Sequence, residues 1–143
     1  ALKKFSDYTL LFTAPNVDYD ANIIRAEIEN FVIQNSNAYF FNSLGSPLYL
    51  SLMRNSSCVI GNSSSGVIEA PLLGVLSVNI GSRQSGRVMS KTILASSFNS
   101  SDIFSTINRA LDKKGSYKLS KLSPKDSPSS KIVKILQKRD FTP

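Results

Sequence analysis

Short apolar runs alternate along the chain with longer stretches in which apolar residues recur every three or four positions. The runs hold β-branched or aromatic side chains and are mostly apolar, which is typical of strands covered on both faces. The helical spacing between them predicts amphipathic helices. The predicted strands are 8–13, 38–41, 58–60, 75–80 and 92–94, and the predicted helices are 21–34, 48–54, 64–73, 101–111 and 129–139.

Strands that alternate with helices predict an α/β fold with a doubly wound parallel sheet. The chain has 143 residues, which is enough for one hydrophobic core and too few for two of ordinary size. We therefore expect a single domain over residues 1–143. Ligands of such sheets bind beyond the carboxyl ends of the strands, so we expect the loops that follow the first four strands to converge on one site. These loops are 15–18, 42–45, 61–66 and 81–87.

The segment Gly61–Pro71 (GNSSSGVIEAP) carries the most specific candidate chemistry. It follows an apolar run and opens a predicted helix with small, hydrogen-bonding residues. Free amides at a helix N-terminus, together with the hydroxyls of Ser63 and Ser64, can hold a phosphate. Glu69 lies too far along the helix to repel that phosphate strongly and can accept hydrogen bonds from a ribose. The purely structural alternative is that the serines only cap the helix.

A second polar cluster, Gly81–Arg87 (GSRQSGR), begins twelve residues after Glu69 and follows the next apolar run. It brings two guanidinium groups, Arg83 and Arg87, to the same predicted edge, and Gln84 is a candidate for orienting Arg83. Strand, phosphate-type turn, helix, strand and arginine loop, in this order, indicate a pocket for a nucleoside diphosphate. The alternative is that both arginines are surface charges. The first explanation for the glycines is the backbone conformation of these turns, which applies to Gly66, Gly81 and Gly86.

Composition excludes several classes of function. The chain contains no histidine, which rules out a Ser-His or Cys-His nucleophilic pair and most zinc sites within it. The single cysteine, Cys58, lies in an apolar run, so we expect a buried structural thiol in a reducing compartment. No apolar run approaches the roughly 18 residues of a membrane helix, and residues 1–5 lack the apolar centre of a signal peptide. We expect a cytoplasmic protein without metal or cofactor.

The formal net charge of +7 raises nucleic acid as a partner. Most of the excess lysines, however, lie in the last third of the chain, among Ser and Pro and with few aromatic residues between them. Bases therefore find no stacking platform there. We interpret this region as a solvated surface rather than as a nucleic-acid site.

The two polar clusters, at this separation, resemble those of the hydrolysing UDP-N-acetylglucosamine 2-epimerases of sialic acid biosynthesis. The segment Thr13–Asp18 (TAPNVD) is similar to the motif after the first strand of that family's C-terminal domain. The segment Leu44–Leu52 (LGSPLYLSL) is similar to the one before its third strand. The likeness runs from about Phe5 to Arg139 and so covers essentially the whole chain.

The resemblance implies that the chain is the C-terminal, Rossmann-like half of a two-domain enzyme of the GT-B type. This half would bind the UDP: Ser63 and Ser64 would hold the diphosphate, Arg83 would neutralise it, and Glu69 would take the ribose hydroxyls. The backbone of 41–44 and the side of Tyr49 would flank the uracil. The full set of substrate-binding residues expected here is Asn62, Ser63, Ser64, Gly66, Glu69, Arg83 and Arg87.

Family catalysis is an anti-elimination of UDP through a 2-acetamidoglucal, followed by hydration to N-acetylmannosamine. Its acid and base carboxylates come largely from the N-terminal domain, so we expect no catalytic residue in this chain and no turnover by it alone. The implied partners are UDP or a UDP-N-acetylhexosamine and the absent N-terminal domain, and a homodimer of the full-length enzyme remains open. A membrane partner is not expected.

Three alternatives stay open at this point. The sugar is either N-acetylglucosamine or a modified one such as diacetylbacillosamine. A GT-B glycosyltransferase donor domain shares the fold and the ribose-binding glutamate, and it differs in giving a glycoside rather than a free sugar. A non-enzymatic basic module would instead bind nucleic acid or another protein through its lysines, with strong salt dependence.

Overall fold

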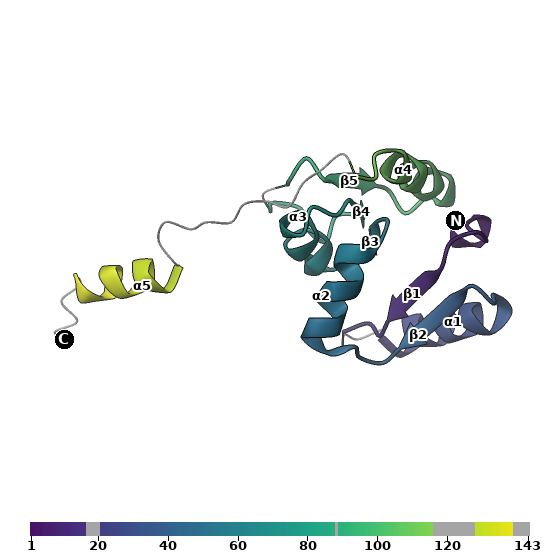
Figure 1. The fold of residues 1–143 in the computed structure, drawn as a ribbon, viewed down its shortest axis with the longest axis horizontal. Helices are drawn as coiled ribbons and strands as arrows, with labels where there is room; N and C mark the ends of the chain where they lie inside the picture. Colours follow the sequence, from purple (N-terminus) through teal and green to yellow (C-terminus); the bar gives the residue numbers. More distant parts are fainter. Residues whose placement is uncertain (17–20, 88, 116–127, 139–143) are drawn as a thin grey trace.

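The computed structural model describes residues 1–16, 21–87, 89–115 and 128–138 of the chain. Strands and helices alternate along most of these residues, as the hydrophobic pattern predicts, although no described helix separates β4 from β5 (Figure 1). Strand boundaries agree with the prediction to within two residues. The elements are a 3₁₀ turn η1 (Leu2–Lys4), β1 (Leu10–Thr13), α1 (Ala21–Gln34), β2 (Ala38–Phe41), α2 (Gly45–Asn55), β3 (Val59–Gly61), a 3₁₀ turn η2 (Ser64–Gly66), α3 (Glu69–Leu72), β4 (Ser77–Ile80), β5 (Ile93–Ser96), α4 (Ser100–Asp112) and α5 (Pro128–Gln137).

All strand pairs among the described residues are parallel, which confirms the Rossmann-like α/β class. The described strands form two hydrogen-bonded groups, β1–β2 and β3–β4–β5, rather than one continuous ladder. Figure 1 shows β1, β2 and α1 on one side of the molecule and β3, β4, β5 and α4 on the other, with α2 between them. With strands of only three or four residues, each pair makes few ladder bonds, so side-chain packing largely decides which strands pair.

The N-terminal segment contacts both groups of strands. Phe5 is buried beside α4, where its ring lies 5.3 Å from the ring of Phe104, centroid to centroid. On the other side, the side-chain amide of Asn37 donates to the carbonyls of Phe5 (3.0 Å) and Tyr8 (2.7 Å). The segment thereby ties the turn before β2 to the core around β4.

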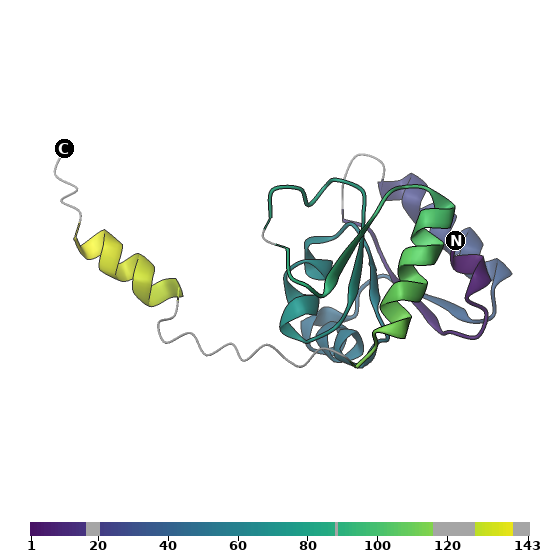
Figure 2. The same cartoon turned by 90° about the horizontal axis from the view of Figure 1, so that it is seen from above.

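The main core lies between the three-stranded sheet and α4. Leu76, just before β4, and Val78, on β4, both face α4. Ile107 and Ala110 of α4 pack against them. The cluster of buried residues is Phe5, Leu76, Val78, Leu94, Ile107 and Ala110. A second cluster joins α2, α3 and the start of β4, with Met53, Ala70 and Val75 at its centre. Figure 2 shows α4 and α3 on opposite sides of this sheet.

The bounds of several helices differ from the prediction; α2, for example, begins at Gly45, three residues before the predicted start at 48. The expected helix 64–73 is split into η2 and the single turn α3 by a turn at Val67 and Ile68, whose amides both donate to the carbonyl of Ser64 (2.9 and 2.8 Å). The helix expected from 101 begins instead at Ser100, with Asn99 as its N-cap: the Asn99 side chain accepts a 2.9 Å hydrogen bond from the Ser101 amide. An N-cap residue satisfies a backbone donor that the first turn leaves unpaired.

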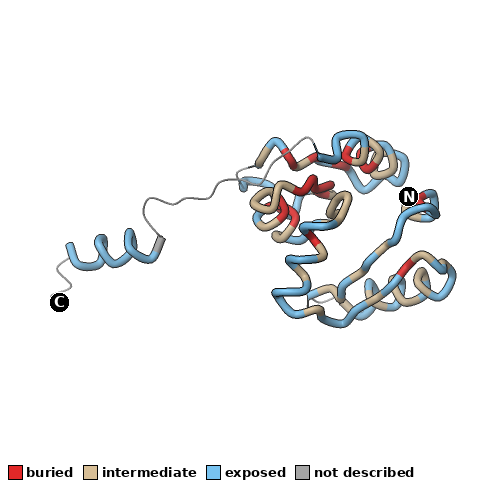
Figure 3. Tube along the Cα trace, in the orientation of Figure 1, coloured by how far each residue is buried: buried red, intermediate tan, exposed pale blue. Residues whose placement is uncertain are grey.

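Burial is concentrated around β4, α3 and α4, whereas β1, β2, α1 and α5 are largely exposed or half-buried (Figure 3). Helix α5 agrees with the prediction except at its last residues, and Arg139 lies outside the described residues. The apolar side chains of α5 are exposed, namely Ile132, Val133, Ile135 and Leu136. Among the described residues, no helix is long and apolar enough to cross a membrane.

Candidate functional site

The two motif loops leave the sheet side by side. Strands β3 and β4 pair in parallel with Gly61 opposite Asn79, so the turn that follows β3 and the loop 81–87 begin at the same edge. A side-chain hydrogen bond then joins them: Gln84 Nε2 donates to the carbonyl oxygen of Asn62 at 2.8 Å. The structure therefore brings together the two loops that the sequence singled out.

Hydrogen bonds within the turn itself hold the serine-rich turn after β3. The Ser63 hydroxyl accepts a long hydrogen bond (3.4 Å) from the Ser65 amide, and the Val67 amide donates to the carbonyl of Ser64 (2.9 Å). The capping role of Ser63 is therefore present in the structure. Because η2 spans only three residues, it lacks the dipole of a full helix, and phosphate binding would depend on the hydroxyls and the individual amides.

Gly66 lets this turn approach β4. A Cβ placed on Gly66 would lie 2.7 Å from Oγ of Ser77, which is itself buried on β4. Real Cβ atoms do not come so close to a neighbouring oxygen, so only glycine fits without a shift of the turn or of Ser77. The predicted substrate-binding role of Gly66 stays a prediction, and its packing role explains the glycine.

Glu69 begins α3 and is half-buried. Its Oε2 atom is buried and has no hydrogen-bond partner within the described part of the chain. An unpaired buried acceptor costs about 1–3 kcal/mol, and more when it is charged. A carboxylate oxygen in this state is suited to accept hydrogen bonds from a ligand hydroxyl, and the ribose assignment for Glu69 remains a prediction.

The arginine loop projects its charges outward around a buried centre. Arg83 and Arg87 are exposed, whereas Gln84 between them is 4% exposed. Gly81, with φ +73°, turns the chain out of β4 beneath the ring of Phe98. The loop closes on itself through the Ser85 amide, which donates to the carbonyl of Ser82 (2.9 Å).

The sequence analysis did not identify Asn79 as a residue of the site, nor the carbonyl of Asn62 as the hydrogen-bond partner of Gln84. Asn79 is 3% exposed at the end of β4, and its Nδ2 donates to the carbonyl of Gly81 (3.4 Å). The Oδ1 atom of Asn79 and the Oε1 atom of Gln84 are both buried without a partner among the described residues. A signal was present, since Asn79 is a polar residue inside an otherwise apolar run.

The other two predicted loops, 15–18 and 42–45, do not follow strands of the sheet that carries the two motif loops. They follow β1 and β2, which pair only with each other among the described strands. Val17 and Asp18 lie outside the described residues, and Asn42 is exposed after β2. Tyr49 packs against the cluster of Met53, Ala70 and Val75. The expected convergence of four loops at one sheet edge is therefore wrong for this structure, because the strands separate into two groups.

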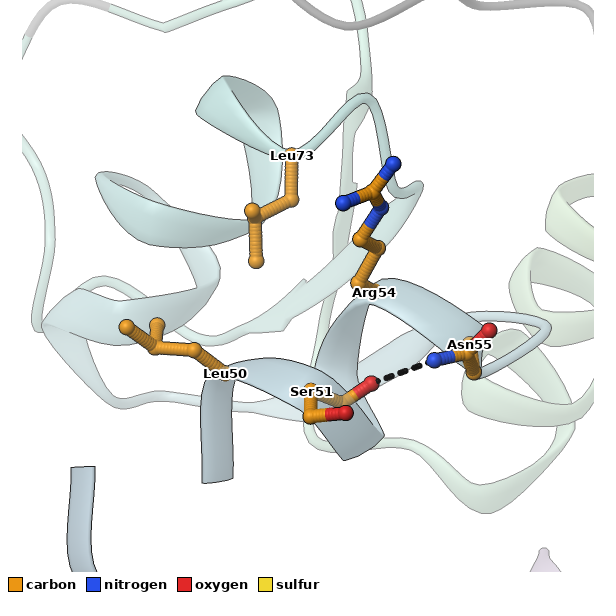
Figure 4. Close-up of a pocket in the computed structure, with 5 residues that line it drawn as sticks. All are labelled: Leu50, Ser51, Arg54, Asn55 and Leu73. Carbon is orange, nitrogen blue, oxygen red and sulfur yellow. Dashed lines mark hydrogen bonds between the residues drawn. The ribbon is translucent and has the colours of Figure 1, made fainter. Parts of the chain in front are cut away.

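Two hollows on the surface of the described residues lie away from the motif loops. One, of about 410 Å³, is lined by Leu50, Ser51, Arg54, Asn55 and Leu73, and Figure 4 shows the bond from Asn55 Nδ2 to the Ser51 carbonyl at 2.8 Å. A second, of about 400 Å³, shares Arg54, Asn55 and Leu73 and reaches Lys114. Neither of these two hollows is lined by a residue of the two motif loops.

Cys58 behaves as a structural thiol. It is partly buried against the main core, and burial raises its pKa to about 11, with a smaller opposing effect from the charge of Lys114. At neutral pH it is protonated and therefore a poor nucleophile. Within the described ranges, no group of three or more Cys, Asp or Glu side chains is placed to hold a metal ion.

Parallel strands with polar loops at their carboxyl ends define a Rossmann-like α/β domain. The family model described as UDP-N-acetylglucosamine 2-epimerase matches residues 1–137. The chain belongs to this family, which confirms the resemblance drawn from its two motif loops.

Curated proteins of the same kind are similar to the chain. It is 39% identical over 102 residues to a GDP/UDP-N,N'-diacetylbacillosamine 2-epimerase (hydrolyzing) of Campylobacter jejuni. The aligned residues make up 71% of this chain and 27% of that protein. It is 33% identical over 107 residues to a UDP-N-acetylglucosamine 2-epimerase of Neisseria meningitidis (75% and 28%). It is 35% identical over 107 residues to the polysialic acid biosynthesis protein P7 of Escherichia coli (75% and 27%). The chain matches about a quarter of the length of these relatives.

Proposed function

We propose that this chain is the UDP-binding domain of a hydrolysing UDP-N-acetylglucosamine 2-epimerase. The observation that carries the proposal is the junction of the two motif loops through Gln84 and Asn62. Beside the first loop, a buried oxygen of Glu69 has no hydrogen-bond partner among the residues that the structure describes. Family membership supports the nucleotide-sugar ligand. The protein that contains this domain would act in the cytoplasm.

The loops offer complementary chemistry to the two parts of UDP. Ser63 and Ser64 supply hydroxyl donors and backbone amides for the diphosphate, and Arg83 supplies a guanidinium that pairs with it. Arg87 adds positive charge to the same loop. Glu69 accepts hydrogen bonds from the ribose hydroxyls. Each charge-assisted hydrogen bond contributes about 1.5–3 kcal/mol, so this set supports micromolar to millimolar affinity.

In the proposed reaction this domain holds the leaving group. The C2 proton and the UDP of the substrate depart on opposite faces, which gives 2-acetamidoglucal, and water then adds to give N-acetylmannosamine. Negative charge grows on the UDP oxygen as the glycosidic C–O bond breaks, and Arg83 stabilises that charge. The base and the acid for the proton and the water would come from another domain, so the chain alone would bind UDP without turnover.

A second candidate substrate is UDP-N,N'-diacetylbacillosamine. It is favoured by the 39% identity to the Campylobacter jejuni protein. The chemistry at C1 and C2 is the same for both sugars, so the UDP-binding residues do not distinguish them. Assays of the complete enzyme with each nucleotide sugar, with product analysis, would separate the two. A glycoside rather than a free sugar would indicate a glycosyltransferase instead.

The first test is calorimetric titration of the chain with UDP. We expect binding that Glu69→Gln and Arg83→Gln each weaken by about tenfold or more, since each removes a charge-assisted contact. Matched controls are Glu27→Gln on α1 and Arg54→Gln beside the hollow of Figure 4, which should leave the affinity unchanged. Absence of binding at millimolar UDP would overturn the proposal for this chain.

A further inference from the structure

Gln84 combines features that distinguish it from the rest of its loop. It is 4% exposed, although its neighbours Arg83 and Ser85 are exposed. Its amide nitrogen reaches across to the carbonyl of Asn62, 22 positions earlier in the chain, at 2.8 Å. The side chain therefore lies between the serine-rich turn and the arginine loop and fixes their separation.

Stability alone explains this arrangement poorly. The Oε1 atom of Gln84 is buried without a partner among the described residues, and so is Oδ1 of the nearby Asn79. A half-satisfied buried amide is less favourable for folding than an apolar side chain of the same shape. Polar groups kept at such a cost are typical of sites where geometry matters more than stability.

We propose that Gln84 is a positioning residue for the diphosphate: through its bond to Asn62 it sets the spacing at which Ser63 and Arg83 engage the same ligand. This rests on the proposed function, because it assumes that the two loops bind one nucleoside diphosphate. Gln84 does not itself need to touch the ligand. Its effect passes through Arg83, whose place in the loop is next to it.

The main variant is Gln84→Met, which keeps the length and shape of the side chain but cannot donate to Asn62. We expect UDP affinity to fall about tenfold, while the thermal midpoint changes by no more than about 2 °C. The matched control is Gln34→Met, an exposed glutamine at the end of α1, which should alter neither quantity. If Gln84→Met does not fold, Gln84→Asn serves instead, because it keeps the amide but is one methylene too short.

A double-mutant cycle separates positioning from general support. With Gln84→Met as background, Arg83→Gln should have much less effect on UDP affinity than in the wild type, because Arg83 is already displaced. Glu69→Gln should keep its full effect, since the ribose contact does not depend on the arginine loop. Residues that couple show non-additive free energies, and independent ones do not.

The outcomes are distinguishable. Failure of the wild type to bind UDP would overturn the proposed function and this inference together. If the wild type binds UDP but Gln84→Met binds equally well, the inference alone is overturned. Independent, additive effects of Gln84→Met and Arg83→Gln would also overturn it. So would an effect of Glu69→Gln that shrinks in the Gln84→Met background as much as that of Arg83→Gln, because Gln84 would then support the fold in general.

Discussion

Gly66 and Ser77 approach so closely that the turn after β3 rests on β4 with no room for a methyl group. A Cβ on Gly66 would lie 2.7 Å from Oγ of Ser77, and Ser77 is 1% exposed. This contact places the serine-rich turn against the strand whose loop carries the arginines. The position of the candidate site thus depends on a pair of small residues that lie eleven positions apart.

Gly66→Ala should therefore destabilise the domain by about 1–3 kcal/mol, the usual cost of overpacking a buried contact. Ser77→Ala removes the oxygen that the new methyl group meets. The double variant should regain most of the lost stability, as measured by urea unfolding. Additive losses in the double variant would show that the contact with Ser77 is not the cause.

Phe5→Ala should cost about 3–5 kcal/mol of unfolding free energy, as for other buried phenylalanines. Phe5 is buried in the main core against α4 and links the N-terminal segment to it. The control is Ile33→Ala on α1, where the side chain is 82% exposed and the expected change is within about 0.5 kcal/mol. Denaturant titrations of both variants test the difference, and equal effects would place Phe5 outside the core.

The thiol of Cys58 should make stability fall at alkaline pH. Burial raises its pKa from 9.0 to about 11 in the folded state. Between these values the unfolded state loses the proton that the folded state keeps, so unfolding becomes more favourable as the pH rises. The stabilising contribution is complete below pH 9.0 and is lost towards pH 11.

The test for Cys58 compares the wild type with Cys58→Ala. Every other ionisable group is common to both proteins, so the difference in unfolding free energy isolates the thiol. That difference should shrink between pH 8 and 11, and thiol alkylation should remain slow at pH 8. Rapid alkylation at that pH would contradict a buried, protonated Cys58.

Asp102 should contribute stability that is lost in acid. Its carboxylate accepts hydrogen bonds from the Ser97 amide (2.7 Å) and the Ser96 hydroxyl (3.3 Å), and these bonds, led by the amide of Ser97, lower its pKa. A carboxyl with a lowered folded pKa stabilises above its unfolded pKa, and the contribution disappears as the pH falls through the folded value.

Asp102→Asn removes the charge that the Ser97 amide stabilises. The variant should be less stable than the wild type at pH 6, and the two should converge as the pH falls below the folded pKa of Asp102. Nuclear magnetic resonance titration of the carboxyl carbon gives that pKa directly. A carboxyl that titrates at its ordinary value would show that the bond to Ser97 is not maintained in solution.

The hydrophobic pattern was sufficient for the order and type of the elements. Apolar runs such as 75–80 and helical spacing such as that of 21–34 depend only on local periodicity, which the chain carries in itself. The pattern overestimated the helix 64–73, because capping serines and helical spacing do not reveal the turn at Val67 and Ile68 that separates η2 from α3. It also did not reveal that β1–β2 and β3–β5 form separate ladders.

The sequence by itself determined the α/β class, the two motif loops and the family to which they belong, because each depends on residues close together in the chain. Only the tertiary structure decided which loops meet. The bond from Gln84 to Asn62 and the contact of Gly66 with Ser77 depend on the register of β3 against β4. That register places residues up to 22 positions apart side by side, and burial on both faces of β4 holds it there.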